Sequence, residues 1–519
     1  EDEGIYVWLD LHVGRRLKAG DRIDGFDEIR KDEPTAGLHG YSYVNASIQR
    51  AMMRFSEDYV SHVNAYTGRR YKDDPGIVAM MVTNENDLTQ HFGNALLPDK
   101  GVPAHSATFM KLADAFAATW GLPKGRIWRT WEPGPSKLFL NDLERRFQVA
   151  MIRHLRSVGV RAPIATTSTW GNSPISSLPA LTVGDVIDVH AYGGSGELAK
   201  DPLLSANMIH WLAAARVVGK PLTVTEWNVE RFPVLGRHAI PLFVAASGRF
   251  QGWDAVMQYA YAQVGMDAAG PPSNWHAYND PALLATLPAA ALLFRRGHVR
   301  ESAIQYVFAP SADQLFQQGI SAGNSRALRT AAEKGKLAIA LPEVRALPWL
   351  EKGEVPTGAR VFSDPAQSFL DADAAGISSD RGELKRNWRD RVFMIDTART
   401  QAAMGRIGSR AIRLADAEIA IETDNATVAV QSLDEQPIRR SRKILVSVAA
   451  RAVPAAGNRL PFAVEPVQGR LRISAPPGLK LYKIPLSGGA GRPTGVPYAD
   501  GRYDIVLDGG APAPWLLLK

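Results

Sequence analysis

The residues IVAMMVTNEN, 77–86, form an apolar run that ends at a single carboxylate, Glu85. A second apolar run, LTVTEW at residues 222–227, meets Glu226 in the same way. Apolar runs of this length, bounded by polar residues, are typical of buried strands. Parallel strands of an α/β barrel all end on one face, so the two glutamates are expected on that face.

Residues 1 to about 300 alternate such runs with longer amphipathic stretches. Strands are predicted at Gly4–His12, Ile77–Asn84, Ile127–Thr130, Ile164–Ser168, Ile187–His190, Leu222–Glu226 and Ala255–Ala260. Helices are predicted at Ala46–Val63 and Asn141–Val158, where apolar residues recur at helical spacing. Strands that alternate with helices indicate βαβ units, a parallel sheet and the α/β class.

The pattern changes after Arg295. Residues 301–380 mix short elements with turn formers and are interpreted as a connecting region. Residues 381–519 are rich in strands and predict an antiparallel β-sandwich or barrel. Strands are predicted there at Arg391–Asp396, Ala417–Thr423, Thr427–Ser432, Ile444–Ala450, Arg470–Ser474 and Tyr503–Leu507. Its few aromatic residues are needed for its own core, so this region is expected to support the α/β domain rather than bind glycans.

Composition excludes several classes of protein. The 519 residues include 60 basic and 53 acidic ones, and the net charge of +7 is scattered. With no glycine-rich phosphate loop and no stripe of basic and aromatic residues, we expect no nucleic-acid partner. No apolar run approaches the roughly 18 residues of a membrane span, so we expect no membrane partner. The absence of cysteine excludes disulfides, thiol catalysis and cysteine–zinc sites.

Two further predicted strands end in polar residues. Asp10 and His12 end the first strand, and His190 and Tyr192 end the strand before Glu226. Together with the two glutamates, these strand ends would place two carboxylates, two imidazoles and a phenol at one face of the barrel. A pair of carboxylates is what glycosidic cleavage requires, since one carboxyl group protonates the leaving oxygen and the other attacks the anomeric carbon or activates water.

Other residues are expected to bind the sugar or to support the nucleophile. The amide of Asn84 is placed to donate to a sugar hydroxyl, and Tyr192 to keep a nucleophilic carboxylate ionised. Flat apolar faces for sugar rings are expected from Trp131, Trp170, Trp227 and Trp275.

At these residues the sequence resembles the clan A glycoside hydrolases, which are retaining (β/α)8-barrel glycosidases. The clan pattern of Asn-Glu after the fourth strand matches Asn84-Glu85, and its nucleophile after the seventh strand matches Glu226. The segment from Asp188 to Tyr192 matches a sixth strand, and Leu9–His12 matches the end of a third. The resemblance covers residues 4–300 and is closest to bacterial cellulase- or β-galactosidase-like members with a C-terminal β domain.

The resemblance implies a (β/α)8 TIM barrel over residues 1–300 and a retaining double displacement. Glu85 would be the general acid/base and Glu226 the nucleophile, with the carboxyl groups about 5–5.5 Å apart. Asn84, His12, His190 and Tyr192 would position the sugar, and no cofactor or metal is implied. The partner would be a carbohydrate substrate, and a periplasmic or extracellular location would follow from this class of function.

The sequence departs from the clan at two places. If Gly4–His12 is the third strand, the first two strand–helix units are absent from this chain. Many members end the eighth strand with a tryptophan, whereas this chain has Met257-Gln258-Tyr259.

Two alternatives stay open. One is a non-catalytic carbohydrate-binding protein on a decayed barrel, which would retain ligand affinity without Glu226. The other is a metal-dependent hydrolase that uses Asp10, His12, His190 and His91, because residues two apart on a strand share a face and Asp-x-His is a ligand-like spacing.

Overall fold

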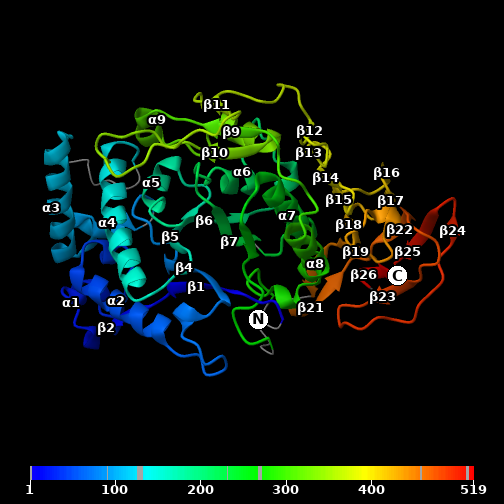
Figure 1. Cartoon of the computed structure of the whole chain (residues 1–519), viewed down its shortest axis with the longest axis horizontal. Helices are drawn as coiled ribbons and strands as arrows, with labels where there is room; N and C mark the ends of the chain where they lie inside the picture. The colour runs from blue at the N-terminus through cyan, green and yellow to red at the C-terminus, as the bar shows by residue number, and fades with distance from the viewer. Residues whose placement is uncertain are drawn as a thin grey trace.

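A computed structural model describes residues 3–90, 92–124, 132–230, 232–266, 272–455, 459–509 and 513–519 (Figure 1). The predicted strand Ile127–Thr130 and the candidate residues His91 and Trp131 lie outside these ranges.

A parallel sheet of six strands forms the centre of the N-terminal region. Its order is β1-β4-β5-β6-β7-β8, and every neighbouring pair is parallel. The strands are β1 Val7–His12, β4 Ile77–Thr83, β5 Ile164–Trp170, β6 Val186–Gly193, β7 Leu222–Val229 and β8 Ala255–Gln258. The prediction of a parallel α/β sheet is confirmed, in the form of a partial barrel. Among the described strands β1 and β8 are edges, so the sheet does not close into eight strands.

Helices surround this sheet, some packed directly on its strands and others packed on neighbouring elements. They are α1 Phe26–Arg30, α2 Ala46–Ser61, α3 Pro103–Trp120, α4 Pro135–Ser157, α5 Leu178–Leu181, α6 Met208–Ala213, α7 Ile240–Gln251 and α8 Pro281–Arg295. A short hairpin of β2 Arg16–Lys18 and β3 Thr35–Gly37 precedes α2.

The two predicted helices begin for identifiable reasons. The side chain of Asn45 accepts hydrogen bonds from the backbone N–H groups of Ser47 and Ile48, which caps α2. Helix α4 begins at Pro135, six residues before its predicted start, because proline is favoured in the first turn of a helix. Its predicted apolar face, which includes Phe147 and Met151, is buried in the main core.

The connecting region holds a small parallel sheet that the sequence did not predict. It is formed by β9 Gln305–Phe308, β10 Lys336–Ile339 and β11 Arg360–Phe362, in the order β10-β9-β11. Two helices, α9 Ala312–Gln317 and α10 Arg326–Lys334, belong to the same region.

Two antiparallel sheets form the C-terminal sandwich. The larger contains β12 Gly376–Ser378, β13 Leu384–Asn387, β14 Val392–Asp396, β15 Thr400–Arg406, β18 Asn425–Ser432, β19 Ile444–Ala450, β26 Trp515–Leu518 and β23 Leu481–Ile484. The smaller contains β16 Arg410–Arg413, β17 Ala417–Ile421, β22 Gln468–Ser474, β25 Arg502–Asp508 and β24 Tyr498–Ala499. A separate hairpin pairs β20 Ala452–Ala455 with β21 Arg459–Val464. One apolar cluster, with Val428 and Ile444 from the larger sheet and Leu471 and Ile505 from the smaller, fills the space between the sheets.

The sandwich packs directly on the N-terminal region, beside α7 and α8 (Figure 1). The buried ring of His238 hydrogen-bonds to Thr427 Oγ1 at 2.8 Å, and Trp515 Nε1 donates to the carbonyl of Ala285 at 3.0 Å. None of the helices that the structure describes has both the length and the apolarity needed to cross a bilayer.

Candidate active site

Glu85 and Glu226 come together at the carboxyl edge of the parallel sheet. Glu85 follows β4, and Glu226 lies in β7, paired with His190 of β6. One carboxylate oxygen from each glutamate and one ring nitrogen of His190 lie within 4.8 Å of one another. Two strand ends that are far apart in sequence therefore supply a close pair of carboxylates.

The backbone at Glu85 is unusual. Its φ angle is +45°, in the left-handed region that non-glycine residues rarely adopt. Its N–H donates to Ser168 Oγ at 3.1 Å, and the hydroxyl of Ser168 donates in turn to Asn84 Oδ1 at 3.4 Å. These contacts hold Asn84 and Glu85 against β5.

The segment after Glu85 rests on buried polar side chains. The N–H of Asn86 donates to Thr167 Oγ1 at 2.9 Å, and the hydroxyl of Tyr43 donates to the carbonyl of Asn86. Glu144, on α4, accepts from the N–H of Leu88 at 2.9 Å. A turn fixed on both sides in this way keeps the strained Glu85 in one orientation.

His190 lies between the two carboxylates. Its Nδ1 is 2.8 Å from Glu85 Oε1 and 3.5 Å from Glu226 Oε2. Its Nε2 is 2.9 Å from Thr225 Oγ1 and 3.2 Å from Asp188 Oδ2. Burial alone lowers the pKa of His190, but the hydrogen bonds to Asp188 and Glu85 outweigh burial and raise that pKa to about 10. The ring is therefore a cation at neutral pH and donates from both nitrogens.

Asp188 is a fully buried carboxylate beneath His190. Thr223 Oγ1 donates to one of its oxygens and Thr225 Oγ1 to the other, both at 2.7 Å. These bonds fix Asp188 on the side of the ring opposite Glu85, where its charge stabilises the imidazolium.

Glu226 is held by the phenol of Tyr192, which donates to its Oε2. Burial raises the pKa of Glu226, and the charge of His190 and the Tyr192 bond lower it, with a net upward shift. Burial and this same hydrogen bond raise the pKa of Tyr192 far above its usual range, so the phenol remains a donor.

Asp10, on β1, belongs to the same charged group. Trp8 Nε1 donates to Asp10 Oδ1 at 3.0 Å. Burial, followed by the negative charges of Asp188 and Glu226, raises the pKa of Asp10 to about 7 even though His190 opposes the shift. Asp10 therefore exchanges its proton near neutral pH.

Trp275 reaches the site from the loop after β8. Its ring meets the ring of Tyr192 edge to face at 5.2 Å and the ring of Tyr259 at 5.7 Å. Trp170 pairs with His190 in the register of β5 and β6, at the end of its strand. Both tryptophans are half-buried. Trp275 contacts the phenol that bonds Glu226, whereas Trp170 lines a small cavity with Pro174 and Ala214.

Two predicted sugar-contacting residues lie elsewhere. The Nε2 of His12 bonds to Ser56 Oγ at 2.9 Å and its ring contacts Phe55, so His12 faces α2. Trp227 is buried in the main core, because it follows Glu226 directly and successive strand residues point to opposite faces. The placement of both at the sugar is corrected accordingly.

Sequence reasoning missed Asp188 and Thr225 as members of the site. The available signal was alternation, since Asp188, His190 and Tyr192 are two apart and share one face of β6. On β7 the register shifts between Thr223 and Glu226, so Thr225 and Glu226 both reach His190, which simple alternation does not predict.

The same side chains include atoms that are able to ligate a metal ion. Glu85, His190 and Glu226 form the one group of three ligand atoms within 4.8 Å that the described residues contain. A metal would need a lone pair on His190 Nδ1, and the raised pKa of His190 favours the ring that is protonated there. Since His12 faces α2, the set that combines it with Asp10 and His190 is not assembled.

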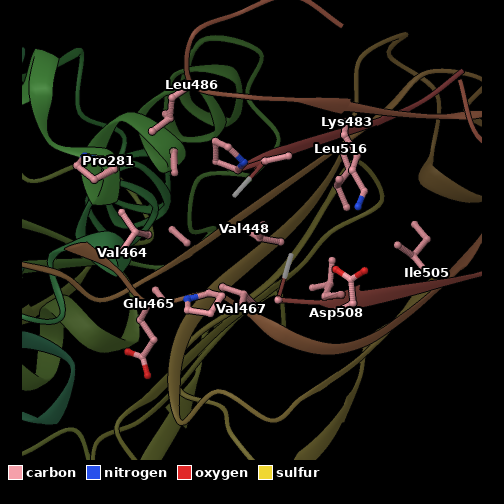
Figure 2. Close-up of a pocket in the computed structure, with 18 of the residues that line it drawn as sticks. Pro281, Val448, Val464, Glu465, Val467, Lys483, Leu486, Ile505, Asp508 and Leu516 are labelled. Carbon is pink, nitrogen blue, oxygen red and sulfur yellow. The ribbon is translucent and has the colours of Figure 1, made fainter. Parts of the chain in front are cut away.

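Two cavities lie near or beyond this site. One, of about 840 Å³, begins at Tyr192 and runs toward the sandwich. The other, of about 120 Å³, lies between α8 and the sandwich and is lined mainly by apolar residues such as Val448, Val467 and Leu516 (Figure 2). None of the site residues described above lines the second cavity.

No model of a known family matches the sequence, and a search of curated proteins gives no match. Solved structures do give matches, each at low identity. The endo-β-1,4-mannanase of Thermotoga petrophila is 16% identical over 60% of this chain and 63% of its own, with a TM-score of 0.36. The β-galactosidase of Rahnella sp. R3 is 14% identical over 65% of this chain and 55% of its own, with a TM-score of 0.38. An endo-1,4-β-mannanase from Rhizomucor miehei is 15% identical over 52% of this chain and 68% of its own, with a TM-score of 0.32.

This chain thus spans less than two thirds of the first two proteins. Because these TM-scores are below 0.5, the likenesses carry no argument, and the chemistry rests on the geometry of the site.

Proposed function

We propose that the protein is a retaining β-glycoside hydrolase that cleaves a polysaccharide or oligosaccharide. The observation that carries this proposal is the separation of Glu85 and Glu226, whose nearest oxygens lie within 4.8 Å. Retaining enzymes hold their carboxyl groups about 5–5.5 Å apart, whereas inverting enzymes need about 6.5–9.5 Å to admit a water molecule.

In the first step Glu226 attacks the anomeric carbon, and Glu85 gives a proton to the departing glycosidic oxygen. The hydroxyl of Tyr192 favours the ionised form of Glu226 that attack requires. Glu85 accepts a 2.8 Å hydrogen bond from protonated His190, so the imidazolium supplies the proton that Glu85 passes to the leaving oxygen, and it regains a proton from Glu85 in the second step. The C–O bond breaks, and a glycosyl ester forms on Glu226.

In the second step Glu85, now ionised, removes a proton from water. The resulting hydroxide attacks the anomeric carbon, and Glu226 leaves as a carboxylate. Two inversions give net retention of configuration. His190, at 3.5 Å from Glu226, stabilises the negative charge that returns to it.

The test is hydrolysis of a panel of β-linked polysaccharides and aryl β-glycosides by the wild type, Glu226→Gln and Glu85→Gln. We expect one substrate class to be cleaved and both variants to lose at least about 10³-fold in kcat. Proton NMR of the first product should show the β-anomer. Azide should restore Glu85→Gln turnover with an activated aryl glycoside, giving a β-glycosyl azide.

Two results would contradict the proposal. An α-anomer as first product would mean direct attack by water. If the wild type binds a carbohydrate without cleaving it, and Glu226→Gln binds it with the same affinity, the protein would instead be a non-catalytic carbohydrate-binding protein. If hydrolysis is found, a periplasmic or extracellular location is proposed with it, and cell fractionation checks that location.

A further inference from the structure

A cavity extends from Tyr192 to the C-terminal sandwich. Its near end is Tyr192, which bonds Glu226. Its walls are the segments that follow β6 and β7, residues 193–200 and 233–236, with Trp211 on α6. Its far end is built by Arg391, Gly405, Arg406 and Asn425 of the sandwich. We refer to it as the inter-domain cleft.

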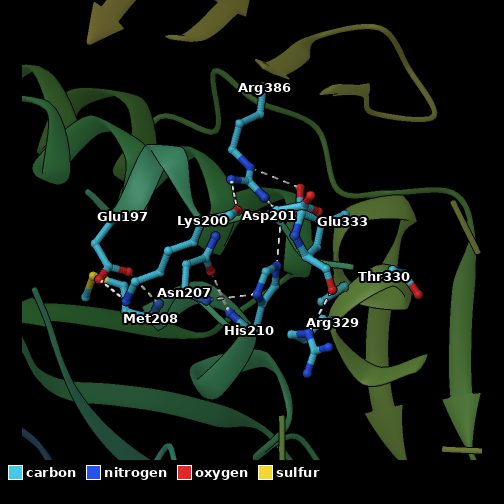
Figure 3. A network of polar contacts seen from close by, with 12 residues as sticks. Glu197, Lys200, Asp201, Asn207, Met208, His210, Arg329, Thr330, Glu333 and Arg386 are labelled. Atoms are coloured by element: carbon cyan, nitrogen blue, oxygen red, sulfur yellow. Dashed lines mark hydrogen bonds and ion pairs between the residues drawn. The ribbon is translucent and has the colours of Figure 1, made fainter. Parts of the chain in front are cut away.

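The wall after β6 is fixed by a buried carboxylate. Glu197 Oε1 accepts from the N–H of Gly194 at 2.8 Å and from Lys200 Nζ at 2.7 Å, while its Oε2 accepts from the N–H of Met208 at 2.7 Å. Figure 3 shows Glu197 and Lys200 side by side in this network.

The sandwich holds the same wall from the other side. Arg386, on β13, donates to the carbonyls of Leu198 at 3.2 Å and Lys200 at 2.8 Å (Figure 3). Leu198 also packs closely on Gly405, where an added Cβ would lie 3.1 Å from its Cδ1. The cleft is therefore preformed, and a ligand does not have to order its wall.

The two ends of the cleft differ in charge. The acidic Glu230 lines the near end, where its N–H donates to the carbonyl of Gly193 at 2.8 Å. Arg391 and Arg406 line the far end, where the N–H of Arg406 donates to the carbonyl of Arg391 at 3.1 Å. Arg406 is 3.4 Å from Asp424. Arg391 is exposed, and no residue that the structure describes pairs with its guanidinium.

We propose that the inter-domain cleft binds further sugars of the substrate chain and that Arg391, assisted by Arg406, binds an acidic group on one of them. This assignment rests on the proposed glycosidase function. A cavity of about 840 Å³ is near the top of the range for small-ligand pockets, about 300–1,000 Å³, so it has room for more than one sugar ring. A guanidinium binds carboxylates and sulfates through paired hydrogen bonds, which gives the anion a fixed position.

The substrate class is therefore an anionic glycan, either a uronic acid polymer or a sulfated one. The sandwich would then contribute directly to substrate binding, in contrast to the supporting role expected from its sequence. The acidic Glu230 at the near end places the anion away from the cleaved bond.

The test measures binding without turnover, by calorimetry on the Glu226→Gln background. The probes are cello- and manno-oligosaccharides and their counterparts oxidised at C6, which are β-1,4-linked glucuronate and mannuronate oligosaccharides. A sulfated galactan oligosaccharide forms a separate arm, so that the carboxylate and sulfate sources are distinguished. Arg391→Ala and Arg391→Lys are compared with Arg413→Ala, which removes an exposed arginine outside the cleft.

We expect one acidic series to bind at least about tenfold more tightly than its neutral counterpart at low salt. Arg391→Ala should abolish this preference, Arg391→Lys should retain part of it, and Arg413→Ala should leave it unchanged. Equal binding of acidic and neutral probes, no binding of either, or equal losses in Arg391→Ala and Arg413→Ala would overturn the inference.

Hydrolysis by the wild type separates the two proposals. Cleavage of neutral glycans without any acidic preference would uphold the glycosidase and reject the anion site. Binding of acidic glycans that depends on Arg391, with no hydrolysis of any probe by the wild type, would keep the cleft assignment and reject the glycosidase.

Discussion

His190 donates toward Glu85 from one nitrogen and toward Thr225 and Asp188 from the other. The imidazolium therefore offsets part of the negative charge that Asp10, Asp188, Glu85 and Glu226 bring to one small volume. Without it, like charges at this distance would force some of these carboxylates to bind protons.

The protonation of Asp10 should respond to Glu226. The negative charge of Glu226 is one of the causes that raise the pKa of Asp10 to about 7. Glu226→Gln removes this charge, so the pKa of Asp10 should fall by up to about 1 unit. Carbon-13 NMR of the Asp10 carboxyl group against pH measures the shift. Asp27→Asn, at an exposed carboxylate, is the control, and an unmoved or upward-moved pKa of Asp10 would contradict the assignment.

At the scale of an element, the segment after β6 depends on Glu197. Its two carboxylate oxygens accept from three donors, so the amide of Glu197→Gln would turn an N–H group toward at least one of them. The variant is expected to lose about 2–4 kcal/mol of unfolding free energy in urea and to raise KM for long substrates. Glu354→Gln, at an exposed position, should change neither quantity.

Apolar runs and strand propensity explain which strands are predictable from the sequence. The strands ending at Glu85 and Glu226 were recognisable from long apolar runs with a polar end. Strand β15, Thr400–Arg406, was missed because its sequence TQAAMGR has low strand propensity and is a strand through burial against its neighbours.

Local geometry at the strand ends accounts for the errors within the site. Trp227 is predicted at the sugar because it is aromatic and follows Glu226, but the register of β7 shifts before Glu226, and the next residue points to the core. His12 has the parity of Asp10, but at the end of β1 its ring turns to Ser56 on α2, a contact that the sequence does not encode locally.

At the scale of the whole molecule, one ionic network joins three regions of the chain. His210 on α6 bonds Glu333 Oε1 at 2.8 Å, and Arg386 of the sandwich pairs with the same carboxylate on α10 (Figure 3). Glu333→Gln would leave Arg386 buried without its counter-charge, which costs about 3–5 kcal/mol of unfolding free energy. Urea unfolding of the full chain measures this loss, and Glu351→Gln, at an exposed position, is the control.

The network also sets an acid limit on stability. Burial alone raises the pKa of Glu333, but Arg386 and His210 lower it to about 2. A carboxyl group with a lowered pKa stabilises the fold fully above its unfolded pKa of about 4.5, and this contribution disappears as the pH falls toward 2. The wild type should therefore lose stability over this window more steeply than Glu333→Gln, which has no group to titrate there. Parallel curves of melting temperature against pH would contradict this assignment.

At Glu85 the left-handed backbone makes the residue needed for activity differ from the residue that would give the highest stability. Glycine is the residue that adopts φ = +45° without strain. The free energy of unfolding of Glu85→Gly should therefore exceed that of Glu85→Ala by about 1 kcal/mol. Both variants lack the carboxyl group and should be inactive, and chemical denaturation compares them directly. If the glycine variant is the more stable of the two, glutamate at position 85 is not the residue that selection for stability alone would favour. The most durable form of the protein would then be one that cannot turn over its substrate.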